Sequence, residues 1–124
     1  MNEYTKKQTG DVGEDYCAKY LKRRGYRIVC RNYRKPCGEI DIIAEKGGVL
    51  CFIEVKTRRI GSVTQPHEAV GLRKQQRIIR AAQLYLAETG RDCFCRFDVC
   101  EVIIIPNKLA LFRIHYIENA FEVR

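Results

Sequence analysis

The sequence predicts an α/β fold in which a helix, three strands, a second helix and two strands follow one another. Apolar residues recur at helical spacing near the N-terminus and again after residue 66, which is typical of amphipathic helices. The other apolar stretches are β-branched or alternate with polar residues, and Lys46-Gly47-Gly48 between two of them is a hairpin signal. The 124 residues give room for one domain. We therefore expect residues 1–124 to form a single domain with a mixed central sheet flanked by helices.

The first predicted element is a helix over residues 11–24. Gly25 ends it, and the basic last turn suits the helix dipole. At about 100° per residue, Glu14 shares its side of the helix with the apolar residues Cys17, Ala18 and Leu21. A buried carboxylate is costly unless it is paired, hydrogen-bonded or metal-bound, so Glu14 is a candidate site residue. The alternative is a first-turn glutamate that faces solvent and is favoured by the dipole.

The three strands that follow include a predicted hairpin. The first strand covers residues 26–31, and the next two lie on either side of the glycine turn. Counting outward from this turn places Asp41 opposite Glu54, and Glu39 opposite Lys56. Side chains two residues apart on a strand share a face, so all four charged groups are expected on one side of the sheet.

Asp41 and Glu54 are candidate metal ligands. The β-carbons of directly opposed residues lie about 5 Å apart, and like charges at that distance destabilise a hairpin. A divalent cation removes this penalty, and Mg²⁺ prefers oxygen ligands such as carboxylates. Lys56 is expected to orient an attacking water or to stabilise developing negative charge. The alternative is a solvated face with cross-strand ion pairs, which explains Glu39 beside Lys56 but not Asp41 opposite Glu54.

The second half of the chain is predicted to contain a long helix and two strands, over residues 66–89, 94–105 and 109–117. Gly71 divides the helix into a short piece and a longer one that ends at Gly90. Residues 59–65 form a loop between the candidate site and this helix. Gln65 and Lys74 are therefore possible neighbours of the site, although nothing in the sequence assigns them to it.

The formal net charge of +8 points to a polyanionic partner. Basic residues stand before, after and beside the acidic centre, which suits a phosphodiester backbone that approaches a metal. The candidate nucleic-acid-binding residues are Arg34, Arg58, Arg73, Lys74 and Arg77. The alternative for the helix arginines is a solvated basic face. No sequence-reading motif is evident, so we expect recognition of nucleic-acid structure rather than of base sequence.

An ordered set of motifs runs through nearly the whole chain. These are Gly13-Glu14, Arg31-Asn32-Tyr33-Arg34, Gly38-Glu39-Ile40-Asp41, Phe52-Ile53-Glu54-Val55-Lys56-Thr57-Arg58, Phe97-Asp98-Val99 and Asn119-Ala120-Phe121. An acid followed on the next strand by Glu-x-Lys resembles the signature of the restriction-endonuclease-like superfamily. The complete set more closely resembles the YraN family of small bacterial proteins, which are predicted nucleases. The resemblance implies the αβββαβ core of that superfamily.

The resemblance also implies a Mg²⁺- or Mn²⁺-dependent endonuclease that hydrolyses phosphodiester bonds in DNA, with branched or damaged structures as candidate substrates. Asp41, Glu54 and the carbonyl of Val55 would bind metal, and Lys56 would assist the attacking water. By its position, Glu14 would complete the acidic cluster, as a helix glutamate does in the similar archaeal Holliday-junction resolvases. Two alternatives stay open: a non-catalytic nucleic-acid-binding or adaptor protein on a nuclease scaffold, and an RNA-processing nuclease. Symmetric cleavage of a junction would favour a homodimer, because paired cuts need two sites.

The composition gives no sign of a membrane protein. The apolar runs at residues 49–53 and 102–105 are far shorter than the roughly 18 residues that a membrane helix needs, and residues 1–10 lack the apolar core of a signal peptide. We therefore expect a cytoplasmic protein without a membrane partner. The seven cysteines are scattered, which argues against a disulfide framework. Cys93-Phe94-Cys95 is too closely spaced for a usual zinc knuckle, so structural zinc is the weaker alternative.

Overall fold

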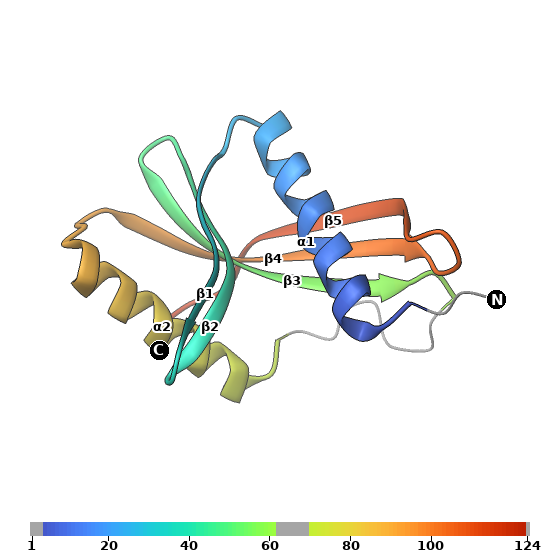
Figure 1. The fold of residues 1–124 in the computed structure, drawn as a ribbon. Coiled ribbons are helices and arrows are strands. Elements are labelled where there is room, and N and C mark those ends of the chain that lie inside the picture. Colours follow the sequence, from blue (N-terminus) through green and yellow to red (C-terminus); the bar gives the residue numbers. More distant parts are fainter. Residues whose placement is uncertain (1–3, 62–69, 124) are drawn as a thin grey trace.

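The computed structural model describes residues 4–61 and 70–123 and has the predicted mixed α/β architecture (Figure 1). The elements are α1 (Lys6–Arg23), β1 (Arg27–Lys35), β2 (Gly38–Lys46), β3 (Val49–Arg59), α2 (Leu72–Thr89), β4 (Phe94–Ile105) and β5 (Ala110–Phe121). The five strands form one sheet in the order β1-β2-β3-β4-β5. Only β3 and β4 are parallel, because α2 connects them, and the other neighbours are antiparallel.

The two helices cover opposite faces of the sheet. Side chains of β2 and β3 alternate between two separate apolar clusters, as the two-residue period of a strand requires. The cluster under α1 includes Cys17, Ala18, Leu21, Ile42 and Ile53. The cluster under α2 includes Ile78, Ala82, Tyr85, Ile43 and Phe52. Two sites on one strand can therefore face different helices.

Helix α1 begins five residues earlier than predicted because a capping box precedes it. The backbone N–H of Gln8 donates to Thr5 Oγ1 at 3.1 Å, and the N–H of Thr5 donates to Gln8 Oε1 at 2.8 Å. These bonds satisfy two N–H groups that a helix start otherwise leaves unpaired. The predicted end is confirmed, since Arg24 is the C-cap and Gly25 follows with a φ of 86°.

The other elements agree with the predictions except at their ends. Strand β4 has the predicted limits, whereas β1 and β5 are longer than predicted. Both are edge strands, whose outward positions accept the polar and charged residues that obscured their length in the sequence. Gly71 is the N-cap of α2 and Gly90 ends it in the left-handed conformation. The short helical piece predicted before Gly71, and Gln65, lie largely outside the described residues. Of the helices in the described part of the chain, none is long and apolar enough to span a bilayer.

Candidate active site

The candidate site lies where the sheet opens between β2 and β3. The predicted hairpin register is confirmed from Lys46–Val49 to the last pair, Ile42–Ile53. Beyond it, β2 stays paired with β1 alone, and Figure 1 shows the far end of the β1–β2 hairpin pointing away from β3. The Val55 N–H donates to Asp41 Oδ2 at 2.8 Å instead of to the backbone of β2. Asp41 and Glu54 are therefore the first residues past the ladder, at the mouth of the opening.

The opening separates Glu39 from Lys56, which were expected to pair. Glu39 lies opposite Arg34 on β1, and Arg34 Nε is 3.6 Å from Glu39 Oε2. The expected pairing of Glu39 with Lys56 is thus wrong. Its physical cause is that this part of β2 follows the twist of β1 and leaves β3.

Glu54 is a buried carboxylate whose hydrogen-bonding capacity is not met. The residue is only 8% exposed, and its Oε2 has no hydrogen-bond partner among the described residues. Lys74 Nζ lies 3.2 Å from this oxygen, but the contact lacks hydrogen-bond geometry. Burial, followed by the neighbouring Asp41 carboxylate, raises the pKa of Glu54 to about 8, while Lys74 opposes the rise. Glu54 therefore keeps its proton to a higher pH than an exposed glutamate does.

Two lysines border this carboxylate from different elements. Lys74 comes from the first turn of α2; burial opposes its charge, but Glu54 and Asp41 raise its pKa above the usual value. Lys56 follows Glu54 by two residues on β3 and so lies on the same face. Lys56 forms no hydrogen bond or ion pair with residues 4–61 or 70–123. The centre thus combines two acids with two cations, one of which is already engaged.

Glu14 approaches the centre from the α1 side of the sheet. Its side chain is 14% exposed and lies on the stripe with Cys17 and Leu21, as the helical spacing predicted. Burial and then Asp41 raise the pKa of Glu14, while Arg31, whose Nη2 is 3.6 Å from Glu14 Oε1, and Asn32 oppose the rise. Asp41 is therefore close enough to Glu14 to act on its charge.

Gly13 allows this close approach of α1. A β-carbon at this position would lie 1.8 Å from Thr57 Oγ1 on β3. Any side chain would therefore push α1, and Glu14 with it, away from the sheet. The sequence pair Gly13-Glu14 thus combines a contact residue with the acid that it positions.

The residues present fit a divalent cation held by two carboxylates. The buried Oε2 of Glu54, which accepts no hydrogen bond from the described residues, and the nearby Asp41 carboxylate form a ligand set that Mg²⁺ commonly uses together with substrate phosphate and water. Within the described ranges, no three histidine, cysteine, aspartate or glutamate side chains form a ready-made metal cage. The ligand roles of Glu14 and of the Val55 carbonyl stay predictions.

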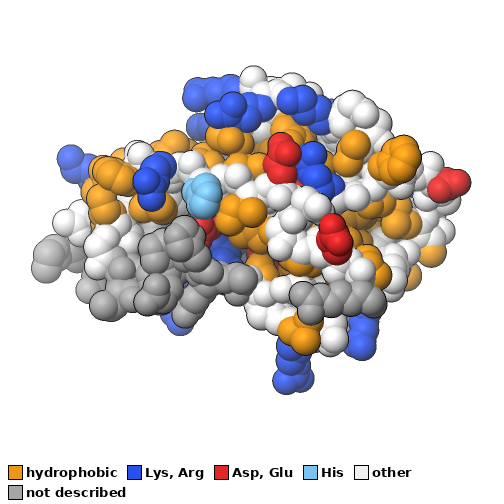
Figure 2. All heavy atoms as spheres, turned by 180° about the vertical axis from the view of Figure 1, so that it is seen from behind, with side chains coloured by type: hydrophobic (Ala, Val, Ile, Leu, Met, Phe, Trp, Pro, Cys, Tyr) orange, Lys and Arg blue, Asp and Glu red, His pale blue; other side chains and the backbone are white. Residues whose placement is uncertain are grey.

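The predicted nucleic-acid-binding residues occupy three environments. Arg73 and Arg77 are exposed on α2, and Arg34 is exposed on β1. Lys74 contacts Glu54, as described above, and Arg58 is mostly buried beside Glu101. Figure 2 shows basic side chains along the upper and lower edges of one face, with hydrophobic side chains between them.

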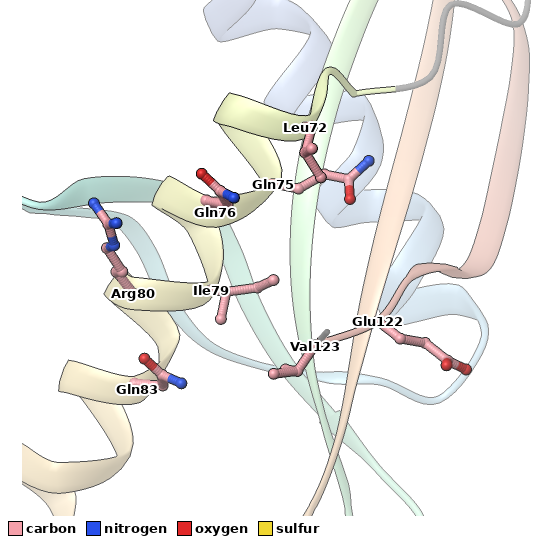
Figure 3. A pocket seen from close by; sticks show the side chains of 8 residues that line it. All are labelled: Leu72, Gln75, Gln76, Ile79, Arg80, Gln83, Glu122 and Val123. Atoms are coloured by element: carbon pink, nitrogen blue, oxygen red, sulfur yellow. The ribbon is translucent and has the colours of Figure 1, made fainter.

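A separate groove runs along the flank of α2 that faces the C-terminal end of β5 (Figure 3). It has a volume of about 330 Å³ and is lined by Leu72, Gln75, Gln76, Ile79, Arg80, Gln83, Glu122 and Val123. None of the predicted site residues lines it. The groove is therefore distinct from the acidic centre, although Lys74 stands on the same first turn of α2 as Leu72 and Gln75.

Comparison with known sequences decides the family. The profile of the uncharacterised protein family UPF0102, the YraN family, matches residues 13–102. This chain belongs to that family. The matched segment contains Glu14, Asp41, Glu54 and Lys56, so the candidate centre lies within the part that defines UPF0102.

UPF0102 relatives match this chain along nearly its whole length. A UPF0102 protein of Alkaliphilus metalliredigens is 50% identical over 116 residues, which are 93% of this chain and 98% of the relative. One of Symbiobacterium thermophilum is 48% identical over 94% of this chain and 98% of its own. One of Caldanaerobacter subterraneus is 42% identical over 98% and 100%. The family assignment therefore applies to the whole chain.

The sequence carried signals for two features of this UPF0102 site that it did not assign. Lys74 stands four residues before buried Ile78, so it lies on the stripe of α2 that faces the sheet. A lysine on an otherwise apolar stripe indicates a nearby acidic partner. Arg31 and Asn32 hold Glu14, and Asn32 has a φ of 55°, a conformation that asparagine tolerates better than most residues. The role of Glu101 beside Arg58 had no local signal, since it depends on the pairing of β3 with β4.

Proposed function

We propose that this protein is a metal-dependent endonuclease that hydrolyses phosphodiester bonds in DNA. The observation that carries the proposal is the unsatisfied, buried carboxylate of Glu54 beside Asp41. Natural proteins rarely leave a buried polar oxygen without a partner unless function requires it. Family membership agrees with the proposal without naming an activity.

In this mechanism Asp41 and Glu54 hold Mg²⁺ or Mn²⁺. The metal, when bound, polarises a phosphoryl oxygen and lowers the pKa of coordinated water. Asp41 is oriented in advance by the Val55 N–H. Glu54 must release its proton before it can act as a ligand, so metal binding competes with protonation.

The two lysines provide positive charge where the phosphate would lie. Lys56 shares a strand face with Glu54 and would stabilise the charge that develops on the phosphoryl oxygens. Lys74, whose Nζ lies 3.2 Å from Glu54 Oε2, would add a second cation beside the phosphate. The exposed arginines Arg34, Arg73 and Arg77 would bind the backbone on either side.

The net charge of +8 supports a nucleic acid as the partner. Nothing in the charge pattern selects base sequence, so structure is the expected basis of recognition. Branched or damaged DNA is therefore the first substrate class to test, with symmetric junction cleavage as the sign of a homodimer.

The test is a cleavage assay with labelled duplex, single-stranded, flap and four-way-junction DNA, and matched RNA, in Mg²⁺, Mn²⁺ or EDTA. Glu54→Gln and Lys56→Met should lower metal-dependent cleavage by about 10³-fold or more, as removal of catalytic groups does. Glu118→Gln, at an exposed carboxylate on β5, is the matched control and should cleave normally. Cleavage that persists in EDTA or in Glu54→Gln would overturn the mechanism. Salt-sensitive binding without cleavage by any of the proteins would favour the non-catalytic alternative.

A further inference from the structure

Strand β1 changes face at Asn32. Residues two apart on a regular strand share a face, yet Arg31 forms ion pairs with α1 while Tyr33 packs into the apolar cluster under α2. The partner strand changes face at the same level, since Ile42 lies in the cluster under α1 and Ile40 lies in the cluster under α2. The β1–β2 hairpin therefore turns over in the row between these residues.

The row in which the hairpin turns over contains a candidate metal ligand. The strand pairs on either side of this row fix the register, so Asn32 on β1 lies across from Asp41 on β2. Asn32 has a φ of 55°, in the left-handed region, and this conformation makes the change of face in β1. A left-handed asparagine is thus the cross-strand neighbour of Asp41.

The side chain of Asn32 needs an explanation separate from that of its backbone. Glycine supplies a positive φ at lower steric cost, so the backbone alone does not require an amide. Arg34 Nη2 donates to Asn32 Oδ1 at 3.4 Å, which leaves the amide nitrogen for an acceptor. That acceptor is the Glu14 carboxylate, whose pKa Asn32 lowers against the effect of burial. The amide therefore connects Glu14 of α1 to the row that contains Asp41.

A second left-handed asparagine has a structural role and offers a comparison. Asn119 on β5 has a φ of 53°, and its backbone N–H donates to buried Asp98 at 2.9 Å. Its amide nitrogen donates to Glu122 at the surface, at 3.3 Å. Asn32 and Asn119 therefore share a backbone conformation but differ in what their amides contact.

We infer that Asn32 is a positioning residue of the candidate centre: its left-handed backbone turns β1 towards α1, and its amide holds the Glu14 carboxylate beside Asp41 for cation binding. The inference rests on the proposed function for the role of the cation, but the contact that holds Glu14 can be tested without metal or DNA. Neighbours that orient a metal ligand commonly raise metal affinity by about 10- to 100-fold.

The test is a double-substitution cycle without DNA. The proteins are the wild type, Asn32→Gly, Glu14→Ala, the variant with both changes, and Asn119→Gly as the matched control. Glycine accepts the positive φ at either asparagine position and removes only the side chain. Mn²⁺ affinity is measured by electron paramagnetic resonance of the free ion. Urea unfolding in EDTA measures stability and shows that each variant is folded.

Asn32→Gly should lower Mn²⁺ affinity about tenfold, whereas Asn119→Gly should leave it unchanged. In the Glu14→Ala background, Asn32→Gly should cause no further loss of affinity, because the asparagine acts through Glu14. In EDTA, the shifts in urea midpoint caused by Asn32→Gly and Glu14→Ala should also be non-additive, because the two side chains are in contact.

The inference would be overturned if Asn32→Gly bound Mn²⁺ as tightly as a Mn²⁺-binding wild type, or if the effects of Asn32→Gly and Glu14→Ala were additive in either cycle. A different result separates the two proposals. If the wild type bound no Mn²⁺ but the urea midpoints were non-additive, the contact that holds Glu14 would stand while the nuclease proposal failed.

Discussion

Two buried carboxylates on neighbouring strands differ in how completely they are hydrogen-bonded. Asp98 on β4 is fully buried and accepts hydrogen bonds from Arg96 Nε at 2.9 Å, from the Tyr116 hydroxyl at 2.5 Å and from the Asn119 N–H at 2.9 Å. Glu54 on β3 is nearly as buried, yet its Oε2 has no hydrogen bond among the described residues. The difference teaches that burial of an acid does not mark a site; incomplete satisfaction of a buried acid does.

The complete network of Asp98 indicates a structural role. Arg96 also donates to the Tyr26 hydroxyl at 2.7 Å, and Tyr116 stacks on Tyr20 of α1. These contacts join α1, the start of β1, β4 and β5. The motifs Phe97-Asp98-Val99 and Asn119-Ala120-Phe121 are therefore explained by folding, whereas Glu54-Val55-Lys56 is not.

The largest expected loss of stability follows from removing the fully hydrogen-bonded carboxylate of Asp98. Asp98→Ala should lower the free energy of unfolding by about 3–5 kcal/mol, because it leaves Arg96, Tyr116 and Asn119 without their acceptor. Urea unfolding measures it, with Glu118→Gln as the exposed control. Glu54→Gln should cost far less, since no hydrogen bond of Oε2 is lost. If Asp98→Ala and Glu54→Gln lowered the free energy of unfolding equally, the proposed difference between the two carboxylates would be wrong.

The second prediction concerns how the free energy of unfolding depends on pH when no metal is bound. The pKa of Glu54 is about 8 in the folded protein against an ordinary 4.5, so the folded state binds more protons between these values. Stability from this group is therefore complete below about pH 4.5 and is lost as pH rises through 8. Urea unfolding in EDTA should show Glu54→Gln gaining about 4 kcal/mol relative to the wild type between pH 5 and 9.

Glu88 provides a control of opposite sign for this measurement. Hydrogen bonds from Tyr33 and then Lys35 lower its pKa, so its contribution to stability is present above the ordinary pKa and is lost as pH falls through the lowered value. Glu88→Gln should therefore lose stability relative to the wild type as pH rises from acid to neutral. Parallel pH profiles for the wild type and Glu54→Gln would contradict the proposed protonation of Glu54.

The third effect concerns the contact that brings Glu14 to the sheet. Gly13→Ala should destabilise the fold by about 1–3 kcal/mol, because its β-carbon meets Thr57. Gly10→Ala is the matched control: it lies in the same helix with nothing within 4 Å, and should stabilise by about 0.5–1 kcal/mol. Thermal melting compares the two. A neutral Gly13→Ala would mean that α1 is not held against β3 by this contact.

The smallest expected effect tests whether Lys74 acts on the pKa of Glu54. Lys74→Met removes a cation that opposes the rise of the Glu54 pKa. The proton should then leave Glu54 at higher pH, so the acid limb of the pH–rate profile should move upward and cleavage at pH 7 should fall about tenfold. Arg73→Gln, its exposed neighbour on α2, should change the salt dependence of DNA binding without moving this limb. An unmoved limb in Lys74→Met would show that Lys74 acts only on binding.

Features encoded within a few residues were predictable from the sequence. The glycine turn at residues 47–48 set the hairpin register, and the helical period placed Glu14 among Cys17 and Leu21. The early start of α1 was also local, but the Thr5 capping box was overlooked.

Features that depend on distant segments were not predictable. The ladder between β2 and β3 ends at Ile42–Ile53 because β1 and β4 draw the two strands apart, which moved Glu39 from Lys56 to Arg34. The contact of Lys74 with Glu54 joins two elements whose relative position no local pattern specifies. The contact of Glu101 with Arg58 could be recognised only from the pairing of β4 with β3.

The bond from the Val55 N–H to Asp41 makes the backbone of β3 a built-in spectroscopic reporter. An amide that donates to a carboxylate changes its proton chemical shift and its exchange rate when that carboxylate is protonated or coordinates an ion. The Val55 amide resonance of 15N-labelled protein would therefore report occupancy of the centre without substrate or mutation. A family defined by its sequence could thus be surveyed for cation binding from one signal per member.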